Sequence, residues 1–234
     1  MLSKRYERYY VEKFDLLLKV FTDLQEAGIL KHLVLVGSWC QDFYRHQFDN
    51  PSEIPATKTM DADILIPRRM PRIRPPVDIV SIMKNNDFIF EIRPRSGLYI
   101  FNHPLLKVEF LTDAGAKPQE ETRHFEYLGV SAQELHFMSL PLRYHYPFTY
   151  GELQFNIPEP EAFALHKLIV CQRRINKEKA EKDRLTAEGM FRFISNDEKR
   201  VQRLREIFTE LSNGWKKKIR AAAVKAEIEL PGQL

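Results

Sequence analysis

The sequence predicts an α/β core followed by an α-helical segment, and two observations support this fold class. Up to about residue 157, short apolar runs rich in β-branched residues alternate with helical patterns. From Pro158 to about residue 226 the pattern is helical, and it starts with prolines and acids, which are typical of a helix N-terminus. We therefore expect two domains, residues 1–157 and residues 158–234.

The elements of the first domain follow from these patterns in order. An amphipathic helix is expected over residues 4–27, because its apolar residues recur at spacings of three and four, and Gly28 is a plausible stop. The apolar run 33–36 reads as a buried strand, and Ser38 can cap a helix over 39–48. The later elements are a strand over 60–66, a helix near 77–85, strands near 88–92, 97–101 and 105–112, and further strands with a short helix over 123–157.

The second domain is expected to contain about four helices, which end near residue 226. Their breaks are expected near Asn176, at Ser195-Asn196 and at Ser212-Asn213-Gly214, where polar residues and glycine interrupt the helical pattern.

Composition limits the class of protein. The chain has 234 residues, of which 44% are hydrophobic and 29% charged, so a disordered or fibrous protein is excluded. Its two cysteines lack metal-ligand spacing and favour a reducing compartment. Because no apolar run approaches the ~20 residues that span a bilayer and the polar start is not a signal peptide, we expect a cytoplasmic protein without a membrane partner.

Positive charge is concentrated in the second domain. Residues 1–157 carry 19 Lys and Arg against 20 Asp and Glu, which gives −1, whereas residues 158–234 carry 17 against 12, which gives +5. This surplus suggests a polyanion nearby, and solvated helix faces explain it equally well.

Three short pieces of the first domain carry candidate chemistry. The first is the turn Gly37-Ser38 between a strand and a helix, where glycine lets the backbone approach a phosphate and the helix start offers free N–H groups. The second is Asp61 and Asp63, which lie two residues apart and so share one face of a strand. Paired carboxylates on an interior strand favour a hard divalent cation between them. The alternatives are an exposed edge strand with solvated acids and an Asp at a helix cap.

The third piece is Glu109, which stands in the middle of an otherwise apolar strand. A buried acid needs a partner. Glu109 could share a metal with the two aspartates, or it could pair with an arginine such as Arg93 or Arg95.

Taken in order, the Gly-Ser turn, the Asp-x-Asp strand and the later acid resemble the DNA polymerase beta-like nucleotidyltransferase superfamily over about residues 30–112. The resemblance implies a nucleotidyltransferase-type mixed sheet flanked by helices and followed by a C-terminal helical unit. It also implies that Gly37 and Ser38 hold a nucleoside triphosphate, and that Asp61, Asp63 and Glu109 bind Mg²⁺ or Mn²⁺ and act in catalysis.

The stretch PEPEAFALHKLIV, followed by Lys182-Asp183, is similar to bacterial nucleotidyltransferase-fold families that include toxins of toxin–antitoxin pairs. This resemblance implies that Lys167 binds the nucleotide and that an antitoxin-like partner exists; the alternative for Lys167 is a boundary position on an amphipathic helix. The chain departs from the common pattern in a longer gap between Ser38 and Asp61, in Glu109 where Asp is commoner, and in Trp39-Cys40 where an arginine is expected.

Four arginines lie in a proline-rich loop directly after the Asp-x-Asp strand, and arginine suits phosphate. This loop and Lys182 are candidate contacts for a phosphate or a polyanionic acceptor, and a solvated connector is the alternative. The arginines are Arg68, Arg69, Arg72 and Arg74.

The predicted function is metal-dependent transfer of a nucleoside monophosphate from an NTP to an unidentified hydroxyl of RNA or protein, with release of pyrophosphate. A catalytically inactive nucleotide- or RNA-binding module of the same fold is the alternative.

Overall fold

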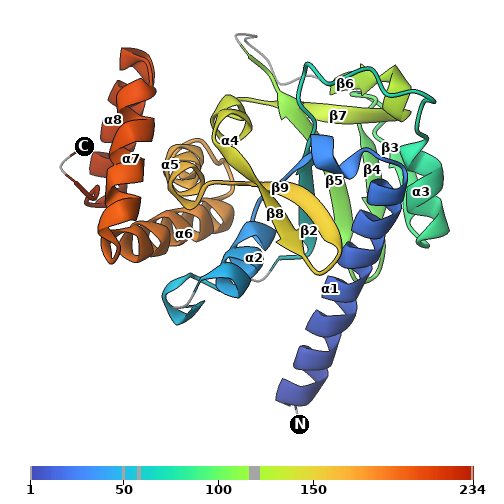
Figure 1. The fold of residues 1–234 in the computed structure, drawn as a ribbon, viewed down its shortest axis with the longest axis horizontal. Coiled ribbons are helices and arrows are strands. Elements are labelled where there is room, and N and C mark those ends of the chain that lie inside the picture. The colour runs from blue at the N-terminus through green and yellow to red at the C-terminus, as the bar shows by residue number, and fades with distance from the viewer. Residues whose placement is uncertain (1, 49–50, 57–58, 116–121, 233) are drawn as a thin grey trace. The chain divides into compact units, whose positions relative to one another are not determined.

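The computed structural model describes residues 2–48, 51–56, 59–115, 122–232 and 234 (Figure 1). The chain forms two compact units that interleave along the sequence. Unit 1 comprises Met1–Gly37, Thr59–Met138 and Pro147–Ile157, and unit 2 comprises Ser38–Lys58, Ser139–Tyr146 and Pro158–Leu234.

The described part of the chain contains a nine-stranded mixed sheet. Its main path has the order β3-β4-β5-β2-β1-β9-β8, while β7 pairs with β5 and β6 pairs with β7. The pairs β2–β5, β5–β7 and β1–β9 are parallel, and β1–β2, β3–β4, β4–β5 and β6–β7 are antiparallel. The strands are β1 (Val34–Val36), β2 (Asp61–Leu65), β3 (Ile89–Ile92), β4 (Tyr99–Asn102), β5 (Lys107–Asp113), β6 (Thr122–Phe125), β7 (Val130–Leu135), β8 (His145–Tyr150) and β9 (Leu153–Pro158).

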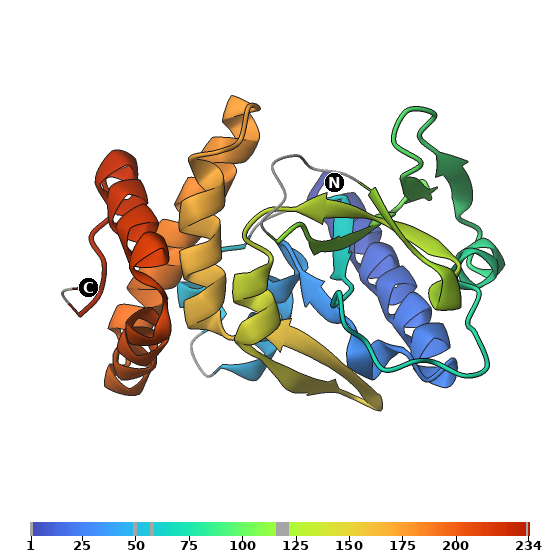
Figure 2. The same cartoon turned by 90° about the horizontal axis from the view of Figure 1, so that it is seen from above.

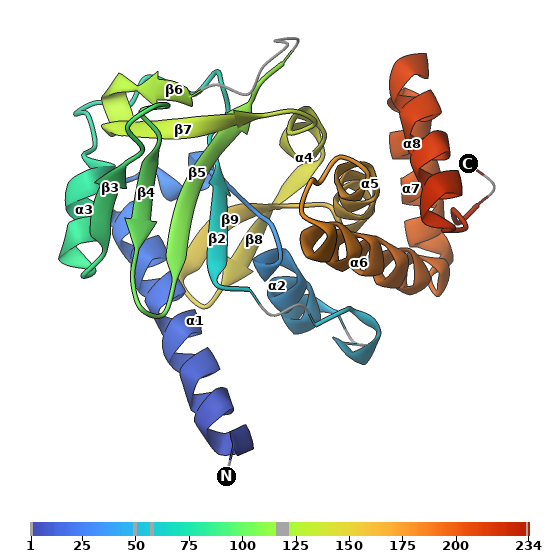
Figure 3. The ribbon, with the colours of Figure 1, turned by 180° about the vertical axis from the view of Figure 1, so that it is seen from behind.

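Helix α1 (Leu2–Glu26) runs beside this sheet (Figures 1 and 2). Its apolar residues Leu17, Val20, Phe21 and Leu24 are at most 1% exposed, as expected for the inner face of an amphipathic helix. The helix gives way to Gly28, whose φ of +74° suits a left-handed C-terminal cap, so the predicted stop is confirmed. Viewed from behind, strands β4 and β5 lie in front of α1 (Figure 3).

The remaining helical elements of unit 1 are short. Helix α3 (Ile79–Asn85) begins at Asp78, whose side chain accepts a hydrogen bond from the Ser81 backbone N–H. The 3₁₀ turns are η1 (Leu30–His32) and η3 (Glu126–Leu128).

Unit 2 is built around helix α5 (Pro160–Cys171), which is buried nearly all round. It packs against α6 (Lys177–Ser195), α7 (Glu198–Glu210), α8 (Asn213–Ala226) and the short α4 (Ser139–Arg143). The four helices predicted after residue 158 are confirmed, with breaks at the predicted positions.

Helix α2 (Trp39–Gln47) and the turn η2 (Pro51–Glu53) also belong to unit 2. The Tyr44 hydroxyl donates a hydrogen bond of 2.6 Å to the Pro158 carbonyl, and the Phe48 and Phe193 rings lie 5.3 Å apart. Gly189 of α6 packs against the Pro55 ring, and a Cβ atom at this position would overlap with Pro55 Cγ. These contacts join Tyr44, Phe48 and Pro55 to residues from Pro158 onward. The division into residues 1–157 and 158–234 stays a prediction.

The fold class predicted from the sequence, a mixed sheet flanked by helices and followed by a helical segment, is confirmed. None of the helices in the described segments combines the length and the apolar character that crossing a bilayer requires.

Candidate active site

The turn after β1 brings Gly37 against the carboxylate of Asp63. Gly37 has a φ of +79°, in the left-handed region that disfavours other residues. A Cβ atom built on Gly37 would lie only 2.6 Å from Oδ2 of Asp63. The position therefore needs glycine both for its backbone and for the close approach of this carboxylate.

Asp61 and Asp63 lie on one face of β2, as predicted. Both are partly exposed, whereas Ala62 and Ile64 between and beside them are at most 1% exposed on the other face. Met60 precedes β2 and lies on the same face as Ala62 and Ile64, and its Sδ atom accepts hydrogen bonds from Tyr9 and Lys13 of α1. The buried face of β2 is therefore turned toward α1. The two aspartates therefore lie on the face turned away from α1.

Glu109 of β5 joins the same face. Strands β2 and β5 are parallel, and their register places Glu109 opposite Asp63 and Lys107 opposite Asp61. Glu109 accepts a hydrogen bond of 2.6 Å from the Lys107 ammonium, and the side chains of Lys107 and Glu109 are 28% and 17% exposed. Glu109 thus pairs with Lys107, where the sequence suggested Arg93 or Arg95 as partners, and metal binding by Glu109 stays a prediction.

Sequence reasoning missed Lys107, although a signal for it existed. Lys107 stands two residues before Glu109 on one strand, and the alternation of side chains puts such residues on one face. A basic residue beside a partly buried acid is its expected counter-charge.

The residues of this face fit a hard divalent cation in their chemistry. Asp61, Asp63 and Glu109 supply the carboxylate oxygens that such cations prefer, and the absence of a Cβ at Gly37 keeps the Asp63 carboxylate free of overlap with the turn. Within the described segments, however, no three His, Cys, Asp or Glu side chains stand ready as a metal site. Coordination by all three acids therefore requires the Glu109 carboxylate to leave Lys107.

Ser38 follows Gly37 and occupies the N-cap position of α2, so the helix begins where predicted. Its side chain makes no capping hydrogen bond, and its φ and ψ of −70° and −22° are helical, so the expected side-chain cap is wrong. The Ser38 side chain is buried, and binding of a phosphate by its hydroxyl stays a prediction.

Lys167 lies in α5 as a buried residue, not at the boundary of an amphipathic helix. Its ammonium donates a hydrogen bond of 2.6 Å to Asp183 of α6, and Arg174 contacts the other carboxylate oxygen at 2.9 Å. Burial alone would raise the pKa of Asp183, but the two cations outweigh it and lower that pKa below its ordinary value. Nucleotide binding by Lys167 stays a prediction.

The arginine loop has no regular secondary structure, as predicted. Arg68 donates a hydrogen bond of 3.2 Å to the Ala114 carbonyl and lies 3.7 Å from the buried carboxylate of Glu134, an acid that sequence reasoning did not single out. The loop's other arginines are exposed, and their contact with an acceptor stays a prediction: Arg69, Arg72 and Arg74.

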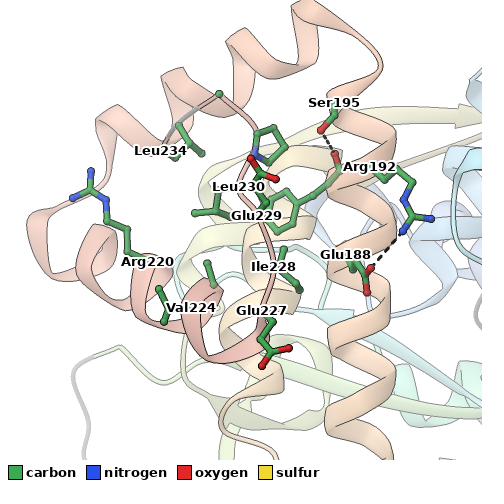
Figure 4. Close-up of a pocket in the computed structure, with 14 residues that line it drawn as sticks. Glu188, Arg192, Ser195, Arg220, Val224, Glu227, Ile228, Glu229, Leu230 and Leu234 are labelled. Atoms are coloured by element: carbon green, nitrogen blue, oxygen red, sulfur yellow. Dashed lines mark hydrogen bonds and ion pairs between the residues drawn. The ribbon is translucent and has the colours of Figure 1, made fainter.

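Among the described residues of unit 2, a larger and a smaller cavity can be compared, and of the predicted site residues Lys182 lines the smaller one. A cavity of about 1060 Å³ lies between α6, α8 and the C-terminal residues, where Arg192 and Arg220 point outward on opposite sides (Figure 4). Lys182 lines the other cavity, of about 710 Å³, together with Lys177 and Leu185. Thus no predicted site residue is among those that line the larger cavity.

Comparison with known proteins identifies the class. A nucleotidyltransferase family profile matches residues 16–210, which is most of the chain, so this chain belongs to that nucleotidyltransferase family. The family supports nucleotidyl transfer as the general activity and an NTP as substrate. No curated protein matches the sequence.

Two solved structures are similar to the chain over most of its length. An antigenic nucleotidyltransferase-like protein from Paracoccidioides brasiliensis is 13% identical, with 92% of this chain and 93% of that chain covered and a TM-score of 0.44. The antibiotic-resistance factor ANT(2'')-Ia is 14% identical, with 93% and 97% covered and a TM-score of 0.44.

Proposed function

We propose that the chain is a metal-dependent nucleotidyltransferase that uses the acidic face of β2 and β5. The acceptor hydroxyl oxygen attacks the α-phosphorus of an NTP, the bond from that phosphorus to the pyrophosphate oxygen breaks, and pyrophosphate leaves. The hydroxyl proton passes to the Glu109 carboxylate as base. The observation that carries the proposal is the Gly37 turn closed against Asp63, whose neighbour in register is Glu109.

Each residue has a definite task in this proposal. Gly37 and Ser38 hold the triphosphate with backbone N–H groups and a hydroxyl. Asp61 and Asp63, with Glu109, hold Mg²⁺ or Mn²⁺, and a divalent ion bound there would neutralise phosphate charge and lower the pKa of the acceptor hydroxyl. We assign Lys167 and Lys182 to the nucleotide and its phosphates, and the exposed arginines of the loop to a polyanionic acceptor.

The test is transfer of label from each of the four α-³²P-labelled NTPs to RNA or protein acceptors in the presence of Mg²⁺. Wild-type protein should transfer label, and the double variant Asp61→Asn/Asp63→Asn should lose at least about 10³-fold, because charge stabilisation of this kind contributes that much. The matched control is Asp87→Asn, an exposed turn residue with a φ of 61° that asparagine also adopts. Equal label transfer by the double variant and the control would sink the proposal.

A second candidate is a nucleotide- or RNA-binding module without chemistry. The Lys107–Glu109 ion pair favours it, because it ties up the third acid. Calorimetry with NTP and Mg²⁺, followed by the labelling assay, separates the two: tight binding without label transfer supports the module.

Within the enzyme class, we propose a cytoplasmic protein of the toxin-like type with an antitoxin-like partner. The sequence resemblance after Pro158 supports this. Expression should arrest bacterial growth for the wild type and not for Asp61→Asn/Asp63→Asn, and growth unaffected by the wild type would remove the toxin assignment.

A further inference from the structure

A lysine shares the proposed metal-binding face with three carboxylates. Asp61 and Asp63 occupy β2, and Lys107 and Glu109 occupy the same two registers of the parallel strand β5. All four therefore project from one face of the sheet, in two adjacent rows. The Lys107 ammonium contacts Glu109 Oε1 at 2.6 Å.

Three carboxylates on one face repel each other, and a positive charge among them offsets that repulsion. Lys107 supplies such a charge from within the chain, since its ammonium binds the oxygen atoms that a divalent cation would also seek. Its side chain is 28% exposed and its stem is flexible, so the ammonium can swing into water when another cation takes its place.

We propose that Lys107 is a positioning residue that holds Glu109 in the metal-free chain and is displaced from it when the divalent metal binds. Metal binding is then a competition between a tethered ammonium and a free ion for the same carboxylate. This inference rests on the proposed function, because it takes Asp61, Asp63 and Glu109 as metal ligands.

A merely structural ion pair makes a different prediction. If Lys107 only joined neighbouring positions of β5, its removal would change the stability of the sheet and leave metal affinity as it is. The metal dissociation constant therefore separates the two roles, and activity is not needed as the readout.

The experiment measures Mn²⁺ binding to the full chain by electron paramagnetic resonance, without NTP. Lys107→Met keeps the stem and removes the charge, and its Kd for Mn²⁺ should fall about fivefold, as expected for loss of a competing ion pair of about 1 kcal/mol. Lys107→Arg keeps the charge and should stay within about twofold of wild type. Lys19 is exposed on α1 of the same unit, and Lys19→Met makes the same charge change away from the site. Its Kd for Mn²⁺ should also stay within about twofold of wild type.

The outcomes separate this inference from the function on which it rests. Wild-type binding of Mn²⁺ that Asp61→Asn/Asp63→Asn abolishes, together with an unchanged or weaker Kd in Lys107→Met, overturns the role of Lys107 alone. No Mn²⁺ binding by the wild type overturns both. Should Lys107→Met fail to fold by circular dichroism, Lys107→Gln replaces it with the same expected direction.

Discussion

Gly37 lets the turn after β1 lie against the Asp63 carboxylate because it has no side chain. Gly37→Ala should destabilise the chain by about 2 to 4 kcal/mol, because it adds left-handed backbone strain to an overlap with Asp63. Urea denaturation measures this loss. Mn²⁺ binding should weaken as well, since the Asp63 carboxylate must move.

Gly97 offers a matched control for this substitution. It also has a positive φ, of +67°, but a Cβ there would meet nothing within 4 Å. Gly97→Ala should therefore cost only the backbone strain of about 1 to 2 kcal/mol and leave Mn²⁺ binding unchanged. Equal losses in the two variants would show that the overlap with Asp63 has no energetic effect.

For single residues, the sequence shows which side chains are chemically unusual but not which of them lie next to each other in the fold. Asp61 and Asp63 stand out because two acids alternate with apolar residues on one strand. The facing of Asp63 and Glu109 depends on the register between two strands far apart in the chain, which no local pattern encodes. The Lys107 partner is local and could have been predicted from alternation alone.

The pairing of α5 with α6 places titratable groups in the interior of unit 2. His166 stands next to Lys167 in α5, and its Nε2 atom is buried without a hydrogen-bond partner. Burial, followed by the charge of Lys167, lowers the pKa of His166 to about 3. The imidazole is therefore neutral in the folded chain at ordinary pH.

This lowered pKa predicts acid sensitivity of the fold. Between pH 6.5 and about 3 the unfolded chain binds a proton at His166 that the folded chain does not, so stability falls as pH falls through this window. The slope from this residue is about 1.4 kcal/mol per pH unit. Urea denaturation at pH 7, 6 and 5 should show His166→Leu losing this slope, while exposed His46→Gln keeps it. A wild-type slope in His166→Leu would contradict the assignment.

Elements were the most predictable level of this structure. The four helices after Pro158 are separated where asparagine, serine and glycine interrupt the helical pattern, and these interruptions are local. The prediction that the Ser38 side chain caps α2 is wrong, because capping depends on the backbone angles of one residue. A favourable residue type does not determine those angles.

At the scale of the whole molecule, local sequence patterns do not reveal how the chain divides into its two interleaved units. The change at Pro158 is visible in composition, but residues of α2 and η2 contact residues from Pro158 onward, for example Tyr44 with Pro158 and Glu53 with Asn196. Such long-range packing leaves no local signature, because an apolar helix face looks alike whichever partner covers it.

This interleaving predicts the behaviour of a truncated chain. A fragment of residues 1–157 lacks Phe163 of α5 and Phe193 of α6, so the rings of Tyr44 and Phe48 lose these aromatic partners. The fragment should aggregate or bind a hydrophobic dye, as exposed apolar patches do. Size-exclusion chromatography and dye fluorescence test this, with the full chain as control; a monomeric fragment without dye binding would show that 1–157 folds alone.

The hydrogen bond from Tyr44 to Pro158 also has a consequence in time. Its two residues lie 114 positions apart, so a ribosome that adds about 5 to 20 residues per second completes the acceptor about 6 to 23 s after the donor. During that interval α2 has been synthesised and its partner helices have not. Until those helices are made, the aromatic residues of α2 lack partners that they contact in the folded chain.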